Sequence, residues 1–271
     1  MPLTIKGTSA GGFTVKGNMT GASAANVKNY LPSQEAGVFL WLRGDLGITL
    51  NGSTVSAWAN QGTAGGSFIQ ATAARQPSYN VSGQAGWPSL TWTPASLTNL
   101  LWSSSSTINA ASNYTFFFAC NPTTATSASQ LWLMDIAGLP SGSPRLIFAQ
   151  DAAVQSKHVA FYRASSGLYQ GTTNNGTTGG QILTFELDST TLTSSTIYRN
   201  GSSIASSLAY DQIAISPGNT TVALTLGAAN SGTASNFAGD MFEVIGVNNL
   251  TSGMRQRVEN YLKIRYGNPL Y

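Results

Sequence analysis

Two carboxylates stand at alternate positions in the segment Phe185–Thr190 (FELDST). If this segment is a β-strand, its period of two places the side chains of Glu186 and Asp188 on one face. Glycoside hydrolysis uses two carboxyl groups at the scissile bond, one as the acid and the other as the nucleophile or base. The segment therefore carries two of the groups that this chemistry needs.

Other catalytic and metal chemistries are limited by a single histidine, His158, and a single cysteine, Cys120. One residue of each type excludes a zinc site with the usual ligand set. We expect His158 to be a surface or strand-edge residue. Cys120 follows the apolar run Thr115–Ala119 (TFFFA) and is expected to be a small buried side chain, and a lone cysteine cannot form an intrachain disulfide.

Calcium needs only oxygen ligands, so the chain's aspartates keep a calcium site open. Asp240 is the candidate ligand, because it follows Gly239 at an expected turn. The alternative is that Asp240 bonds its own backbone there. No cofactor is expected apart from this calcium alternative. Further aspartates that could contribute are Asp45, Asp135, Asp151 and Asp211.

Carbohydrate recognition would use flat aromatic rings against sugar C–H groups, together with hydroxyl and amide hydrogen bonds. Trp102, flanked by Ser103–Ser106, is the aromatic residue least easily assigned to a core. The alternative is that these rings are core residues, as most aromatic residues in strands are. The candidate ligand-binding residues are Trp102, Trp87, Tyr162 and Tyr169, with Trp92 and Trp132 also considered.

The composition is that of an exterior protein. Charged residues make up 8% of the 271 residues, against roughly 25% in ordinary soluble domains, so Ser, Thr, Asn, Gln and Gly supply most of the polar surface. The net charge of +3 does not imply nucleic acid. No apolar run is long enough to span a membrane, and Met1–Tyr30 does not resemble an export signal. A processed mature chain, an unusual export route and a viral protein released by lysis remain open, and we favour the third.

Short apolar or alternating runs separated by turn residues predict an all-β sandwich. Asn51-Gly52 and Asn200-Gly201 are expected to close tight hairpins, because both residues of such pairs tolerate positive φ. The predicted strands are Val38–Leu42, Thr54–Trp58, Ser89–Trp92, Tyr114–Cys120, Leu131–Asp135, Arg145–Ala149, Val159–Arg163, Gln181–Leu187, Ser195–Arg199, Thr221–Leu226 and Met241–Val247.

One helix is predicted, over Ser252–Tyr266, with Ser252 as its N-cap and Gly267 at its end. Its basic residues are expected to form a solvated face rather than a surface for a partner. The apolar face should contain Met254, Val258, Tyr261, Leu262 and Ile264, and the basic residues are Arg255, Arg257, Lys263 and Arg265.

The first 33 residues differ from the rest and are predicted to be an N-terminal arm, followed by one domain over residues 34–271. Thr4–Lys6 (TIK) and Phe13–Lys16 (FTVK) are short alternating segments joined by the Gly-rich Gly7–Gly12. An exposed strand edge of this kind can pair with another chain. Phe13 and Val15 are therefore the expected assembly residues.

Several segments in order along the chain resemble the laminin-G-like, concanavalin-like jelly-roll family in the version found in bacterial and phage surface proteins. The resemblance spans roughly Gly37–Gly267 and implies an all-β jelly-roll sandwich of two antiparallel sheets with one C-terminal α-helix. Relatives bind carbohydrate or protein on a concave face, and others are enzymes or purely structural. The matching segments are FLWLRGD (Phe39–Asp45), VSAWAN (Val55–Asn60), ARQP (Ala74–Pro77), FAGDMFE (Phe237–Glu243) and RQRVENYLKIRYG (Arg255–Gly267).

Two enzyme patterns of that fold are incomplete in this chain. Jelly-roll β-glucanases carry Glu-x-Asp-x-(x)-Glu on one strand, but Thr190 and Thr191 stand where the last Glu would be. Tyr162–Gln170 (YRASSGLYQ) resembles the tyrosine strand of jelly-roll alginate lyases. Their Gln-Ile-His strand has no equivalent, because Leu183 follows Gln181-Ile182. We therefore predict that the chain is not an enzyme.

The function predicted is that of a non-enzymatic phage virion surface protein, a capsid decoration or tail-associated component. The arm would bind other virion proteins, and the sandwich would face outward and bind cell-surface carbohydrate. A homo-oligomer is expected, without nucleic acid and without membrane insertion. The alternatives are a polysaccharide-cleaving enzyme of the same fold and a secreted bacterial lectin.

Overall fold

The structure is a computed structural model, and it describes part of the chain. In β8, β11, β12, β13, β17 and β18, and in parts of β10, it describes the backbone alone. The described residues are 30–83, 86–103, 107–109, 113–123, 131–137, 144–151, 156–163, 167–171, 179–188, 195–204, 206–208, 219–221, 223–228 and 236–267.

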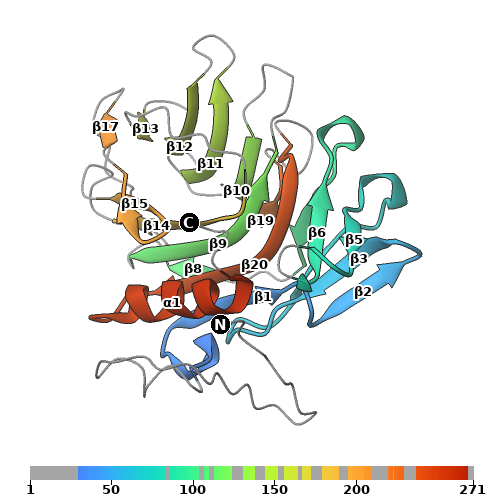
Figure 1. Cartoon of the computed structure of the whole chain (residues 1–271), viewed down its shortest axis with the longest axis horizontal. Helices are drawn as coiled ribbons and strands as arrows, with labels where there is room; N and C mark the ends of the chain where they lie inside the picture. Colours follow the sequence, from blue (N-terminus) through green and yellow to red (C-terminus); the bar gives the residue numbers. More distant parts are fainter. Residues whose placement is uncertain are drawn as a thin grey trace, which may run out of the picture.

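The fold is all-β, with one C-terminal helix (Figure 1). Every strand pairing within the described residues is antiparallel. One layer has β20 (Gly239–Asn248) at its centre, bonded along one side to β9 and along the other to β6 and β1. β9 continues through β14 and β15 to β16. These strands are β1 (Val38–Arg43), β6 (Ser89–Trp92), β9 (Tyr114–Pro122), β14 (Gln181–Leu187), β15 (Thr196–Arg199) and β16 (Ser202–Ser203).

The second layer runs in the spatial order β2, β3, β4, β7, β19, β10, β11, β12, β13 and β17. β5 (Ser78–Asn80) joins the layers, because it pairs with both β3 and β6. β8 (Thr107–Asn109) and β18 (Asn219–Thr221) form a separate pair. The strands of the second layer are β2 (Ile48–Asn51), β3 (Thr54–Ala59), β4 (Ser67–Ile69), β7 (Leu100–Trp102), β19 (Ala223–Leu226), β10 (Leu131–Ala137), β11 (Pro144–Asp151), β12 (Ser156–Arg163), β13 (Gly167–Gly171) and β17 (Ser206–Leu208).

The main core lies between the two layers. Phe116 and Phe185 of the first layer share it with Leu226 of the second, and the ring centroids of Trp58 on β3 and Trp92 on β6 lie 6.4 Å apart. Trp41 and Trp58, which lie in the segments that carry the family resemblance, are both buried. The all-β sandwich with a C-terminal helix is therefore confirmed.

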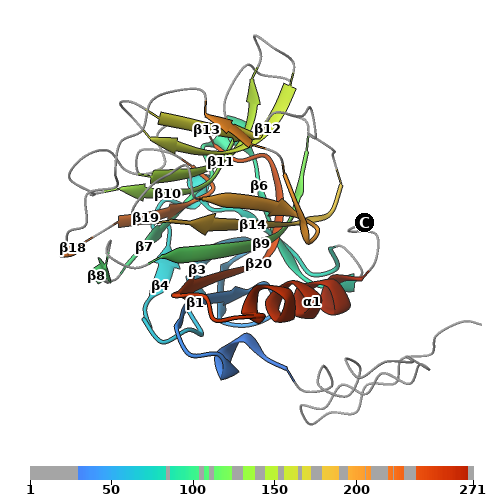
Figure 2. The same ribbon diagram turned by 90° about the vertical axis from the view of Figure 1, so that its left-hand side faces the viewer.

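The central strands of the first layer, β1, β20, β9 and β14, are buried on both faces, which explains their continuous apolar runs. In β9, Phe116 and Phe118 face the main core, while Phe117 faces a second cluster beneath the helix α1 (Met254–Tyr266). Figure 2 shows α1 along the outer side of this layer. The run TFFFA is thus a central strand, and Cys120 at its end is buried as expected.

A β-bulge in β20 places a buried carboxylate under the helix. The register shifts between Met241 and Glu243, so Phe242 and Glu243 both face α1 while Met241 faces the main core. The Trp41 indole N–H and the Tyr266 hydroxyl, at 2.7 Å, donate to Glu243. Burial raises the pKa of Glu243, and the charge of Arg265 opposes that rise.

Arg265 links the helix to this carboxylate and to the first layer. Its Nε lies 3.4 Å from Glu243 Oε2, and its Nη2 lies 2.6 Å from Asp45 Oδ2. Its guanidinium also covers the ring of Trp87 at 3.8 Å. The prediction of a solvated basic face is therefore wrong for Arg265 and for Arg255, whose side chains are 12% and 15% exposed.

The helix bounds match the prediction closely, with two corrections. The N-cap is Gly253 with φ +73°, and no side chain caps the helix, so Ser252 is not the cap. Ile264 is 45% exposed, while Tyr266 completes the buried face. Gly267 ends the helix with φ +81°, as expected. Among the described helices, none combines the length and apolar character needed to cross a bilayer.

The chain enters the sandwich across α1. The ring of Tyr30 meets Tyr261 edge-on at 6.1 Å, and Arg257 donates to Glu35 at 2.6 Å. A short 3-10 helix, Pro32–Gln34, lies between them. Residues 1–29, including the predicted assembly residues Phe13 and Val15, lie outside the described residues, and the arm stays a prediction.

One predicted hairpin turn is confirmed and the other is displaced by one residue. Asn200 and Gly201, with φ +52° and +86°, connect β15 to β16. Between β2 and β3, Asn51 pairs with Thr54, so the loop residues are Gly52 and Ser53. Asn51 belongs to the strand, and the positive φ falls on Gly52 alone.

Candidate functional site

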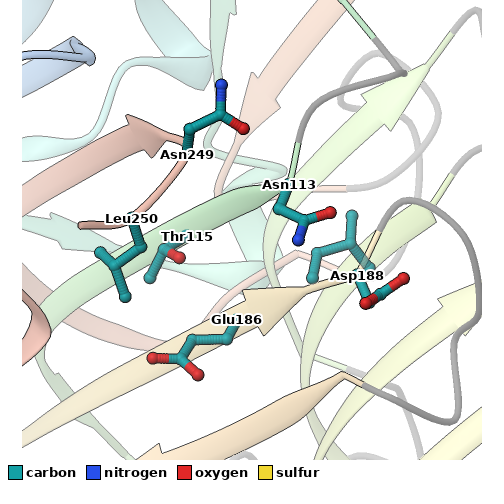
Figure 3. A pocket seen from close by; sticks show the side chains of 7 residues that line it. Asn113, Thr115, Glu186, Asp188, Asn249 and Leu250 are labelled. Atoms are coloured by element: carbon teal, nitrogen blue, oxygen red, sulfur yellow. The ribbon is translucent and has the colours of Figure 1, made fainter. Parts of the chain in front are cut away.

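A pocket of about 370 Å³ opens on the helix-bearing face of the first layer, near the start of α1 (Figure 3). Figure 3 shows Glu186 on β14 and Asp188 just beyond its end, with Thr115 on the neighbouring strand β9, Asn113 just before that strand, and Asn249 and Leu250 further along. The lining residues are Asn113, Thr115, Glu186, Leu187, Asp188, Asn249 and Leu250.

Strand pairing brings these side chains together. Glu186 lies opposite Thr115 in the β14–β9 ladder, and the alternation of β14 turns Phe185 and Leu187 into the main core while Glu186 faces the pocket. Asp188 follows on the same side. The sequence prediction that Glu186 and Asp188 share one face is therefore confirmed.

The third wall comes from the connection between β20 and α1. Asn249 adopts a left-handed conformation with φ +53°, which Asn tolerates better than most residues. Its backbone N–H donates to the Asn113 carbonyl at 2.9 Å. This bond ties the connection to the start of β9 and brings the two asparagines to the same pocket.

Arg255 and Tyr198 hold Glu186 at the pocket margin. Arg255 Nε lies 3.3 Å from Glu186 Oε1, and the Tyr198 hydroxyl donates to Glu186 Oε2 at 3.3 Å. Burial raises the pKa of Glu186, while the charge of Arg255 and the Tyr198 hydrogen bond oppose the rise. Both carboxylate oxygens of Glu186 are therefore engaged by protein groups.

Arg255 itself is fixed by the helix and by the neighbouring strand. Its Nη1 donates to Glu259 Oε2 at 2.8 Å, and its guanidinium lies 3.9 Å from the centre of the Tyr198 ring. Glu259 is buried and accepts a second bond from Thr184 at 2.8 Å. Sequence reasoning missed this arrangement, although two oppositely charged residues at i and i+4 were visible in the helix.

Of the predicted ligand-binding aromatics, the two with described side chains, Trp102 and Trp87, do not line this pocket. Trp102 packs on Phe68 with centroids 4.9 Å apart, at the margin of the main core. Trp87 lies under Arg265 and meets Tyr266 edge-on at 6.3 Å. Tyr162 belongs to β12 and Tyr169 to β13, and their side chains lie outside the described residues.

Asp240, the predicted calcium ligand, accepts a hydrogen bond from the hydroxyl of Thr91 on the paired strand β6. Burial raises the pKa of Asp240, and the bond from Thr91 opposes this. Among the described residues, no three His, Cys, Asp or Glu side chains gather as a metal site would need. Calcium at Asp240 stays a prediction.

No protein-family model matches this chain, and no curated protein matches it. Among solved structures, it is similar to domain 4 of AbnA, a GH43 extracellular arabinanase from Geobacillus stearothermophilus in complex with arabinotriose. The identity is 14%, with 71% of this chain and 81% of that chain covered and a TM-score of 0.46.

Two further similarities are to the CBM40 of Ruminococcus gnavus IT-sialidase bound to α2,6-sialyllactose and to Trypanosoma rangeli sialidase in complex with sialic acid. For the CBM40 the identity is 13%, the coverage 55% of this chain and 83% of that chain, and the TM-score 0.35. For the sialidase the identity is 13%, the alignment covers 89% of this chain and 35% of that chain, and the TM-score is 0.43. All three TM-scores lie below 0.5, which does not establish a common fold.

Proposed function

We propose that this chain is a non-enzymatic structural protein of a phage virion surface, and that its sandwich binds glycan in the pocket between β14, β9 and the β20–α1 connection. The observation that carries the glycan-binding proposal is the lining of this pocket. Carboxylates, carboxamides and a hydroxyl converge on one cavity beside a leucine.

This set of groups matches what a sugar offers. Carboxylates accept hydrogen bonds from hydroxyls, and carboxamides such as those of Asn113 and Asn249 both donate and accept. Leu250 supplies an apolar surface for sugar C–H groups. The volume is near the lower end of the roughly 300–1,000 Å³ of small-ligand pockets, which suits a chain end or a branch of a glycan.

The same geometry supports binding without catalysis. A general acid or base must exchange a proton with the substrate, but both oxygens of Glu186 are held by Arg255 and Tyr198. The glucanase pattern would place its last carboxylate at Thr190 or Thr191, where the sequence has hydroxyls. In this arrangement the carboxylates of Glu186 and Asp188 accept hydrogen bonds from sugar hydroxyls.

The virion assignment rests on composition and on the sequence resemblance. A chain with 8% charged residues and a single cysteine suits an exterior protein stabilised by packing. The order of the motifs along residues 37–267 supports the laminin-G-like jelly-roll family. The arm would bind other virion proteins, and the sandwich would face outward. A secreted lectin is the second candidate, since it would use the same pocket.

A glycan array followed by calorimetry tests the binding site. We expect Asn249→Gly to weaken binding of an array-selected oligosaccharide about 5- to 10-fold, the equivalent of about one hydrogen bond, and to leave stability unchanged because Gly accepts the positive φ. Asp188→Asn should weaken binding as well. Its matched control is Asp240→Asn, the same change on β20, where Asn still accepts the bond from Thr91.

Three results would contradict the proposal for the pocket. The first is an oligosaccharide whose affinity survives Asn249→Gly and Asp188→Asn. The second is loss of binding in Trp102→Phe, which keeps the packing on Phe68 and would return the site to the aromatic candidates. The third is release of new reducing ends or unsaturated products from any bound polymer. Separately, antibodies against the sandwich should label intact particles, and their failure to do so would exclude the virion surface.

A further inference from the structure

The two layers differ in how their outer strands are covered. The outer edge of β1 is closed by the loop that follows β3: Gln61 N donates to the Trp41 carbonyl at 2.7 Å and Thr63 N to the Val38 carbonyl at 3.0 Å. The side chain of Asn60 adds two bonds to the same edge, accepting from Trp41 N and donating to the Phe39 carbonyl. No strand can add there without displacing this loop.

The strand β2 lies at the outside of the second layer, beyond β3 (Figure 1). Within the described part of the chain, β2 pairs with β3 alone. A strand paired on one side turns half of its backbone N–H and C=O groups outward. The apolar side chains Leu50 and Leu46 are 49% and 43% exposed beside this edge.

The sequence of β2 lacks two of the devices that usually protect an edge, namely charged side chains and proline. Proteins guard edge strands with charges, with Pro or by covering them. β2 reads ITLN and lies between Gly47 and Gly52, without a charged residue or a proline. Its one irregularity is a register shift between Thr49 and Leu50. Apolar side chains next to unpaired backbone groups favour an added strand.

We infer that the edge of β2 accepts the segment Phe13–Lys16 from the N-terminal arm of a second copy of this chain. This inference rests on the assembly role of the arm in the proposed function and names its acceptor. In FTVK, Phe13 and Val15 alternate with Thr14 and Lys16, so an added strand would present both apolar side chains to one face. That face would cover Leu50.

Length and charge support a second copy as the donor. The arm leaves the domain at Tyr30, which packs on Tyr261 of α1. Residues 17–29 can extend about 45 Å from that point, enough to cross to a neighbour. The net charge of +3 gives little repulsion between copies. If each copy donates its arm to the other, a closed two-fold dimer forms in which both β2 edges are paired.

Light scattering after size exclusion tests the pairing in the full-length chain. We expect wild type to run at twice the chain mass, and Val15→Asp and Leu50→Lys to run at the monomer mass. Thr14→Asp controls the arm, because Thr14 faces away from the buried side. Val81→Lys controls the domain, because Val81 is 70% exposed and lies outside β2. Both controls should remain dimers.

Cross-linking separates exchange between copies from pairing within one chain. Full-length Val15→Cys and Leu50→Cys are mixed and treated with a short bismaleimide. Cys120 is buried, and burial raises the pKa of its thiol, so it stays unreactive. A product that joins the two different chains is expected, and Leu50→Cys mixed with Thr14→Cys should give less of it.

Each outcome decides one point. A monomeric wild type, or a dimer that survives Val15→Asp, overturns the inference, while the binding of the arm to other virion proteins is judged separately by the incorporation of the chain into particles. A dimer abolished by Val15→Asp but kept in Leu50→Lys overturns β2 as the acceptor. If the mixed product is absent, a full-length variant that carries both Val15→Cys and Leu50→Cys decides the reason: cross-linking within single chains overturns the second copy as the donor, and no cross-linking overturns β2 as the acceptor. Glycan binding is measured separately in each variant.

Discussion

Replacement of Leu262 by Ala tests whether α1 is an integral part of the sandwich. Leu262 is fully buried in the cluster between the helix and the first layer, beside residues such as Trp41 and Phe117. The change removes three carbon groups, about 2.4 kcal/mol of transfer free energy, and leaves a cavity whose cost raises the total to about 2–5 kcal/mol. For a domain of this size that lowers the Tm by roughly 5–15 °C.

The matched control is Ile264→Ala, two residues further along the same helix. Ile264 is 45% exposed, so the same kind of truncation should cost less than about 1 kcal/mol, and the better helix propensity of Ala offsets part of that. Urea unfolding followed by tryptophan fluorescence gives both free energies. Equal losses in the two variants, or an unfolding midpoint that Leu262→Ala does not shift, would refute the docking of α1 and the buried cluster beneath it.

Three further changes test the charged contacts and a tight backbone approach. Tyr266→Phe removes the hydroxyl that donates at 2.7 Å to the buried carboxylate of β20, and denaturation at pH 7 should show a loss of about 1.5–3 kcal/mol. Burial opposes ionisation of Asp45, but two arginines outweigh it and lower its pKa. The ionised Asp45 therefore stabilises the fold above its unfolded-state pKa near 4, and this stabilisation is lost as the pH falls. Asp45→Asn should make the free energy of unfolding fall less steeply between about pH 5 and 2. An unchanged slope would count against the ion pairs. Gly227→Ala should unfold the protein or lower its free energy of unfolding by about 3 kcal/mol or more, because φ is +74° and the new Cβ would clash with the Trp92 indole. The control is Gly52→Ala, where φ is +63° and the space around the Cβ is open, and it should cost only about 1 kcal/mol.

Each strand that the sequence predicted has at least four residues, which is enough to show a pattern. β6 and β14 have the predicted bounds, and the apolar run of β9 reflects burial on both faces. The strands β4, β5 and β7 have three residues each. Three residues cannot display an alternation, and such strands are held by neighbours that the local sequence does not reveal.

Half of the pocket could be predicted in the same way. Glu186 lies in β14 and Asp188 directly follows this strand, so their placement at one pocket depends on a spacing of two residues, which is a local property. Asn113 and Asn249 reach them because β9 pairs with β14 on one side and with β20 on the other. The partners of a strand depend on the packing of the whole sheet, so one sequence did not indicate which residues would face the carboxylates.

The basic residues of α1 show why a local charge pattern predicted the wrong environment. Arg265 pairs with Asp45, in the turn after β1, and with Glu243 on β20, and both carboxylates lie outside the helix. A signal was present in β20, where Glu243 interrupts an apolar strand and so required a buried partner. Arg255 has a further role, since it holds Glu186 at the pocket margin while the helix holds Arg255. The helix α1 thus fixes Glu186, in one wall of the pocket, through Arg255. It also begins just after Leu250, which lies in another wall. The docking of α1 and the shape of the pocket therefore depend on each other.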